Sequence, residues 1–182
     1  MNATYIIVAV VFIVLITGAI LGIVFARRQH SKRLQGQFGT EYDHTVEVLG
    51  DKKKAHAELD ERQKHVASLD IHPLSVNEHK RYVADWAAVQ SKFVDEPGQA
   101  VVEADRLIME VMQMRAYPVS DFDQRAADVS VSYPALVSNY RAARVIALKN
   151  QEYQADTEEL RQAMIYYRSL FDELLVTDAV VV

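Results

Sequence analysis

An apolar run without a charged residue opens the chain, from Thr4 to Ala26. As a helix rising about 1.5 Å per residue, this run is long enough to cross a hydrocarbon core of about 30 Å. The pattern therefore predicts a transmembrane helix over residues 4–26, preceded by a short N-terminal stub at residues 1–3.

Downstream of residue 74, apolar residues recur every three or four positions, which is the spacing of one buried helix face. The stripe of Tyr82, Trp86, Val89 and Phe93 shows it most clearly. No window has the period-two alternation of a half-buried strand. We expect an all-α fold with one N-terminal transmembrane helix, in which residues 75–176 form a small antiparallel helical bundle. Six side chains should share its core: Trp86, Phe93, Leu107, Tyr140, Met164 and Phe171.

Residues 40–74 carry few apolar positions, which predicts a polar helix or stalk. Thr40-Glu41-Tyr42-Asp43 has the form of a capping box, after a segment expected to loosen at Gly36 and Gly39. Gly50 should interrupt the helix that follows. A second capping box is predicted at Ser75–Glu78, Asp156-Thr157-Glu158-Glu159 should cap the last helix, and residues 177–182 form a tail.

Basic residues follow the apolar run at once, at Arg27, Arg28, Lys32 and Arg33. Such residues stay on the cytoplasmic side of a span, and the N-terminal flank of this span has none. We therefore expect a basic juxtamembrane collar over residues 27–39 and a cytoplasmic C-terminal domain. The four collar cations are candidate ligands for lipid headgroups.

A cleaved signal peptide is the alternative, because Val24-Phe25-Ala26 fits a small-residue cleavage rule. Residues 1–5 hold no basic residue, however, and the apolar run exceeds the roughly 7–15 residues of the hydrophobic region of a signal peptide. The basic collar directly after the run also favours an anchor over a cleaved leader. The absence of cysteine fits a reducing compartment, although many exported proteins lack it as well.

The remainder of the chain is acidic. All 25 Asp/Glu and 16 of the 20 Lys/Arg fall in residues 41–182, which gives this region a net charge of −9. Nucleic acid is not expected as a partner, because its binding needs a phosphate-neutralising basic face. Lys52-Lys53-Lys54 is the one dense basic run outside the collar, and we interpret it as a solvated helix face.

Two glycines in the predicted span, Gly18 and Gly22, form a small-xxx-small pattern. Glycines at this spacing share one helix face and let a second helix approach closely. The span is thus a candidate for homo-oligomerisation or for packing against another protein's span. The alternative is that glycine is simply common in membrane helices.

The sequence predicts no catalytic, metal or cofactor site. Only Glu41-Tyr42-Asp43-His44 has the Glu-x-x-His spacing of a carboxylate-bridged di-iron site, which needs two such motifs. His56 and His65 lie half a helical turn out of phase. The acidic pairs Asp121/Asp123 and Glu158/Glu159 fall at predicted helix starts, where carboxylates complement the helix dipole.

Several segments resemble recurrent blocks of a family of uncharacterised bacterial single-pass membrane or "secreted" proteins. The blocks are Phe38-Gly39-Thr40-Glu41-Tyr42-Asp43, residues 69–74, residues 122–128 and the segment from Arg161-Gln162-Ala163-Met164 to Leu175. The resemblance covers nearly everything after the anchor and implies a bacterial inner-membrane location, but it implies no activity. Thr40 stands where the family pattern has Pro, and His44 where it has Arg.

Two classes of function follow from these features. The first, which we favour, is a membrane-anchored interaction or scaffold protein, or an accessory subunit of a membrane complex, with lipids and a protein as partners and no enzymatic activity. The second is a ligand-sensing or enzymatic helical domain whose pocket no short motif reveals. A pocket with convergent, strongly perturbed carboxylates would favour the second.

Overall fold

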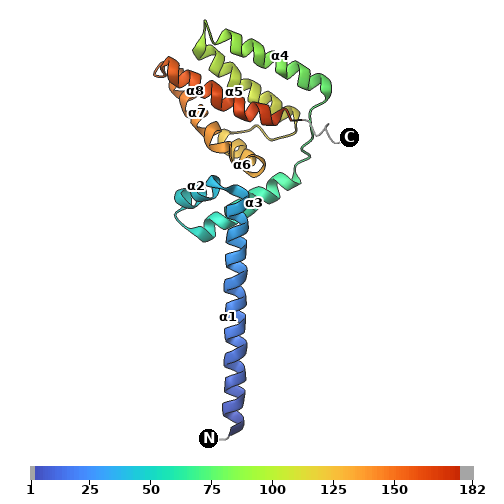
Figure 1. Cartoon of the computed structure of the whole chain (residues 1–182), viewed down its shortest axis with the longest axis vertical. Coiled ribbons are helices and arrows are strands. Elements are labelled where there is room, and N and C mark those ends of the chain that lie inside the picture. Colours follow the sequence, from blue (N-terminus) through green and yellow to red (C-terminus); the bar gives the residue numbers. More distant parts are fainter. Residues whose placement is uncertain (1–2, 177–182) are drawn as a thin grey trace.

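The computed structural model describes residues 3–176 and, from residue 12 on, every side chain except that of residue 14. Within that range the chain is all-α, as predicted, and forms no strand. Its helices are α1 (Ala3–Phe38), α2 (Thr40–Leu49), α3 (Lys52–Ser68), α4 (Val76–Lys92), α5 (Pro97–Met114), α6 (Phe122–Ser132), α7 (Val137–Gln151) and α8 (Thr157–Leu174). In Figure 1, α1 is a long rod that carries the other helices at its C-terminal end, and we call those helices, with the last turns of α1, the head.

Helices α4 to α8 form the predicted helical bundle around one apolar core. Helix α8 packs against both α5 and α7, and α4 packs on α5. The ring of Trp86 stacks on that of Phe171 with 4.6 Å between centroids. Five of the six predicted core residues are buried, but Phe93 is only partly so, because it lies at the C-cap where the chain leaves α4.

Three bundle helices, α4, α6 and α8, begin at caps that the sequence predicts. Ser75 and Asp156 form complete capping boxes with Glu78 and Glu159. The Asp121 carboxylate accepts a hydrogen bond from the backbone N–H of Gln124 and caps α6. These carboxylates satisfy helix N–H groups that would otherwise lack partners, so they are structural.

The N-terminal helices form a second, smaller packing unit. Helices α2 and α3 fold back on the C-terminal part of α1 around a buried cluster of Leu34, Phe38, Tyr42 and Leu59. Helix α3 also packs against α6, which joins this unit to the bundle. After leaving α1, the chain therefore folds back so that both of the next two helices contact α1.

Two predictions for this region are wrong. Helix α1 continues through Gly36 and breaks only at Gly39, because Leu34 and Phe38 are buried and hold its last turns against Tyr42 and Leu59. No capping box forms at Thr40. Gly39 is the N-cap of α2, at φ 52°, and no side chain caps that helix. The carboxylate of Glu41 has a different role, described below.

The predicted span lies within α1, and α1 has no break between residues 4 and 26. The side chains of residues 4–11 and 14, and the whole tail at 177–182, fall outside the described residues. As far as the structure describes them, none of the helices combines the length and apolarity required of a membrane span.

Candidate lipid-headgroup site

The N-terminal part of α1 stands apart from the head (Figure 1). Its large apolar side chains, where the structure describes them, are exposed. The large apolar side chains described between Phe12 and Phe25 are from 41% exposed at Val24 to 69% exposed at Phe25. A helix that is hydrophobic all round is normally buried in a core or in a membrane. Nothing in the described chain covers this one.

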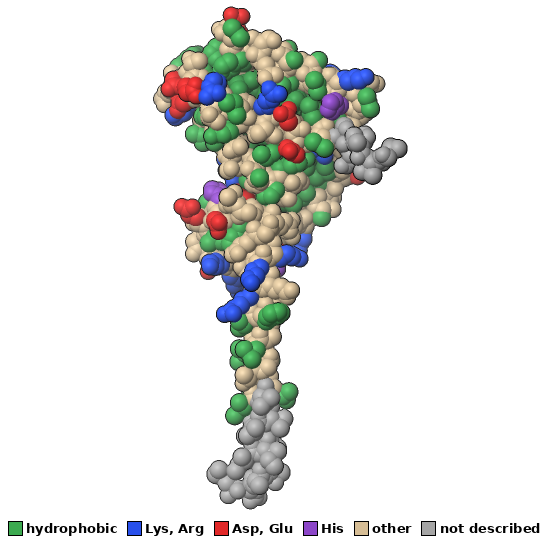
Figure 2. Space-filling model, in the orientation of Figure 1, with side chains coloured by type: hydrophobic (Ala, Val, Ile, Leu, Met, Phe, Trp, Pro, Cys, Tyr) green, Lys and Arg blue, Asp and Glu red, His purple; other side chains and the backbone are tan. Residues whose placement is uncertain are grey.

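Cations surround α1 where the apolar surface ends. Arg27, Arg28, Lys32 and Arg33 are all exposed, and at about 100° per residue they project from different sides of the helix. Lys52, Lys53 and Lys54 at the start of α3 are exposed too. Figure 2 shows Lys and Arg side chains gathered at this junction, which we call the basic foot of the head.

An open cavity of about 610 Å³ lies in the basic foot, between α1 and the N-terminal half of α3. Three cations line it, Arg27 from α1 and Lys52 and Lys53 from α3. Its one carboxylate, Asp60, is already engaged, at 3.0 Å from Nε2 of His30 and 3.6 Å from Nη2 of Arg33. The remaining lining residues are His30, His56, Ala26 and Ala57.

Two imidazoles form the inner wall of this cavity. The rings of His30 and His56 meet edge to face with 5.6 Å between centroids. His56 Nε2 lies 3.0 Å from the hydroxyl of Tyr42, which lies 3.2 Å from that of Ser31. Burial, with smaller contributions from His30 and Lys52, lowers the pKa of His56, although Asp60 opposes this.

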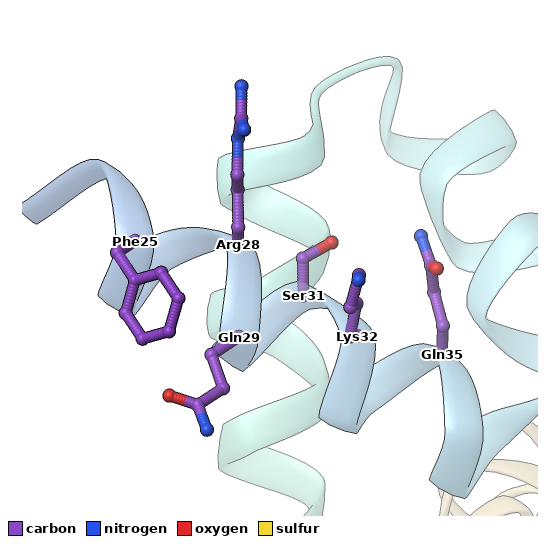
Figure 3. A pocket seen from close by; sticks show the side chains of 6 residues that line it. All are labelled: Phe25, Arg28, Gln29, Ser31, Lys32 and Gln35. Carbon is purple, nitrogen blue, oxygen red and sulfur yellow. The ribbon is translucent and has the colours of Figure 1, made fainter. Parts of the chain in front are cut away.

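A second hollow, of about 690 Å³, lies along α1 itself. Figure 3 shows its lining, in which Phe25 lies one helical turn before Arg28 and Gln29, and Lys32 follows one turn later. Ser31 and Gln35 complete it. An apolar ring thus lies next to two cations, as at the boundary between acyl chains and headgroups.

An ion-pair cluster around the buried carboxylate of Glu41 links the N-terminal helices to the bundle. Glu41, whose side chain is 1% exposed, receives hydrogen bonds from Arg62 Nη1 at 2.8 Å and from both terminal nitrogens of Arg141. These three residues come from α2, α3 and α7, so one carboxylate joins the N-terminal unit to the bundle. Arg62 also donates to Ser130 in α6.

The two arginines determine the charge state of Glu41. Burial alone would raise the pKa of this carboxyl, but the hydrogen bonds and positive charges of Arg141 and Arg62 outweigh it and hold the pKa below its usual value. Glu41 is therefore ionised at neutral pH, and the cluster is a charged bridge between helices rather than a proton donor.

The structure separates the predicted headgroup residues. Arg27 faces the cavity between α1 and α3, Arg28 and Lys32 face the second hollow, and Arg33 pairs with Asp60. Gly18 and Gly22 lie on the exposed part of α1, and a Cβ atom added at either would meet nothing within 4 Å in the described chain.

The sequence did not predict that α3 contributes lysines to the cavity of the basic foot. Lys52 and Lys53 are solvated, as expected, but the return of the chain through Gly39 and Gly50 also brings them to Arg27. The left-handed C-cap at Gly50, with φ 64°, is a signal for this turn. The burial of Glu41 and its pairing with Arg141, 100 positions away, had no local signal.

Buried acidic residues of the bundle do not converge on one site. Asp105 pairs with Arg144 at 3.1 Å, whereas Asp128 accepts a hydrogen bond from Gln124 and lies 3.6 Å from Nε2 of His65. Within the described residues, no group of three or more His, Cys, Asp or Glu side chains could hold a metal ion.

Comparisons with protein-family models, with curated proteins and with solved structures found no match to this chain.

Proposed function

We propose that this chain is a single-pass membrane protein whose helical head acts at the cytoplasmic face as an interaction or scaffold protein, or as an accessory subunit of a membrane complex. One observation carries the proposal. The uncovered apolar part of α1 is followed directly by a ring of cations at the base of the head. Hydrocarbon would cover the apolar side chains, and anionic headgroups would neutralise the ring.

The charge distribution supports this placement. Residues 41–182 have a net charge of −9, yet Lys52, Lys53 and Lys54 lie at the foot, next to the collar. Each basic residue near an anionic leaflet contributes about 1 kcal/mol of attraction. An anionic membrane would therefore hold the foot and repel the rest of the head.

The span offers a face for association with a second span. Gly18 and Gly22 are uncovered and lie one turn apart, so a second helix could approach the backbone there. We propose packing at this face, either between two copies of the chain or against a partner subunit.

The head offers a groove between α4 and α8 to a protein partner. It is a cavity of about 180 Å³ lined by Trp86, Phe93, Met164 and Ile165, with Arg161 and Arg168 at its rim. An apolar floor with a polar rim is the usual composition of a docking surface. Both arginines are already paired within α8, Arg161 with Glu158 and Arg168 with Asp172, so we propose a partner segment that docks mainly through apolar side chains.

Affinity purification of the full chain from membranes, followed by mass spectrometry, tests the interaction role. Ile165→Glu places a charge in the groove, and Val145→Glu is the matched control, because Val145 is similarly exposed but lies on α7 outside the groove. We expect a protein recovered with the wild type and the control but lost with Ile165→Glu. Recovery of no protein above background would refute a scaffold role.

A cysteine at Ser91 tests the orientation. Ser91 is exposed on α4, and the chain has no natural cysteine. With the head in the cytoplasm, a membrane-impermeant maleimide should label Ser91→Cys only after the cells are lysed. Labelling in intact cells would show that the head lies outside.

A further inference from the structure

We propose that the cavity between α1 and α3 is a binding site for a phosphate monoester, supplied by the headgroup of a membrane lipid. The choice of a lipid as the source rests on the membrane anchoring proposed above. The choice of a phosphate monoester rests on the cavity alone.

The positive charge of the cavity lining is the first reason to expect a phosphate ligand. Arg27, Lys52 and Lys53 line the cavity, and none of them forms an ion pair with a described residue. The single carboxylate of the lining, Asp60, is already engaged by His30 and Arg33. The cavity thus holds an excess of positive charge that a multiply charged anion would neutralise.

The number of donors favours a monoester over a diester. A phosphate monoester carries a charge of about −1.5 to −2 at pH 7 and has three strong acceptor oxygens. The three cations of the cavity, which come from two helices, can neutralise this charge and donate hydrogen bonds to the three oxygens. The phosphodiester of an ordinary headgroup has one negative charge and two free oxygens, so it would leave part of the positive charge uncompensated.

The place and size of the cavity fit a lipid. A volume of about 610 Å³ lies within the range of roughly 300–1,000 Å³ typical of small-molecule sites. Ala26 forms part of its wall, and the apolar surface of α1 begins next to it at Phe25. A phosphate bound between Arg27 and Lys53 would therefore leave the acyl chains beside the apolar helix.

The imidazoles supply a spectroscopic reporter. His56 is faced by Tyr42 from α2, by His30 from α1, and by Asp60 and Lys52 on its own helix. Its lowered pKa means that the ring is largely neutral near pH 7. A bound dianion stabilises the protonated ring. Binding should therefore raise the pKa of His56, a change that loosely associated ions would not produce.

The test uses the full chain in detergent micelles and two kinds of probe. The soluble probes are glycerol 3-phosphate, a monoester, and glycerophosphoglycerol, a diester, and the readout is the NMR titration of His56. The lipid probes are phosphatidic acid and phosphatidylglycerol in equal amounts, and the readout is the lipid retained in native mass spectrometry. We expect the monoester of each pair to bind preferentially and glycerol 3-phosphate to raise the pKa of His56.

Neighbouring lysines provide matched variants. Lys53→Ala removes a cation from the lining, whereas Lys54→Ala removes the same charge one residue away, outside the lining. Both lysines are exposed, so neither change should affect folding. Loss of one charge-assisted contact should weaken monoester binding about tenfold or more in Lys53→Ala. Lys54→Ala should change the affinity for the monoester by less than about twofold.

The possible results test the phosphate site separately from the membrane anchor. Equal losses in Lys53→Ala and Lys54→Ala would show diffuse attraction and overturn the site. Binding of glycerol 3-phosphate without any preference for phosphatidic acid would support the monoester and overturn the lipid as its source. If neither monoester binds while the full chain still fractionates with membranes, the site is refuted and the anchor stands.

Discussion

At the residue scale, the contact of greatest consequence is the one between Glu41 and the two arginines. It links the neighbouring helices α2 and α3 to α7, which is distant in sequence, and the carboxylate is almost fully buried. Removing one member of such a cluster leaves uncompensated charge in a site shielded from water. Together with the packing of α3 on α6, this contact attaches the N-terminal unit to the bundle.

Glu41→Gln should destabilise the protein by about 1–3 kcal/mol, because Arg141 would lose its carboxylate partner and Arg62 would keep only Glu58. Glu47→Gln, on an exposed position of the same helix, should change stability by less than about 0.5 kcal/mol. Denaturant unfolding of both variants measures the difference. Equal stability would mean that the cluster does not join the two units.

Glu41 should also make the stability of the protein depend on pH. Folding lowers the pKa of Glu41, so its contribution to stability is fully present above the unfolded value of 4.5 and is lost as the pH falls through the folded value. The difference in stability between wild type and Glu41→Gln should therefore shrink on acidification below pH 4.5.

Asp128 should make stability depend on pH in the direction opposite to that of Glu41. Its Oδ2 atom has no described partner, and burial raises the pKa of the carboxyl despite the hydrogen bond from Gln124 and the charges of His65 and Arg62. Its stabilising contribution is therefore present below the unfolded value of 3.8 and lost as the pH rises through the folded value. At neutral pH the ionised form opposes folding.

Asp128→Asn removes this penalty, because the amide is uncharged and keeps an acceptor for Gln124. The variant should unfold at a higher denaturant concentration than wild type at pH 7, with the advantage shrinking toward pH 3. Asp123→Asn, at an exposed position of α6, serves as the control. A variant less stable than wild type at pH 7 would show that the Asp128 charge is compensated in the fold.

At the scale of the elements, α4 is attached to the bundle mainly through its apolar stripe. Trp86 is 5% exposed and stacks on Phe171 in α8. Trp86→Ala should cost about 3–5 kcal/mol in thermal or denaturant unfolding, whereas Val94→Ala, 82% exposed just after α4, should cost almost nothing. An unaltered melting curve for Trp86→Ala would contradict this packing.

The last turns of α1 belong to the head. Leu34 and Phe38 are fully buried against Tyr42 and Leu59. A fragment of residues 27–182 should therefore be more stable than one of residues 40–182, since each large buried side chain contributes about 2–5 kcal/mol. Circular dichroism melts compare the two fragments. Identical midpoints would show that α1 contributes nothing to the head.

Local patterns predicted the bundle well and the N-terminal unit poorly. The caps at Ser75, Asp121 and Asp156 need only neighbouring residues, so the sequence reveals them. The capping box expected at Thr40 failed because Gly39 is the N-cap of α2, which places Thr40 inside the helix. The pairing of Glu41 with Arg141 and the cavity of the basic foot depend on contacts between helices, which no local motif encodes.

At the scale of the whole molecule, three surfaces follow one another along the axis of α1. They are the uncovered apolar part of the helix, the basic foot (Figure 2), and a head whose net charge is negative. This order matches the hydrocarbon core, the anionic headgroup layer and the aqueous phase of a cytoplasmic leaflet. The anchoring proposal is therefore the claim on which the rest depends.

Alkaline carbonate extraction of membranes tests that claim most directly, because carbonate releases peripheral proteins but not spanning ones. The comparison uses the full chain and the double variant Leu15→Glu/Leu21→Glu, which places two charges on exposed positions of α1 without touching the head. The account predicts that the wild type stays in the membrane pellet and that the variant moves to the supernatant. Wild-type protein released into the supernatant would contradict it.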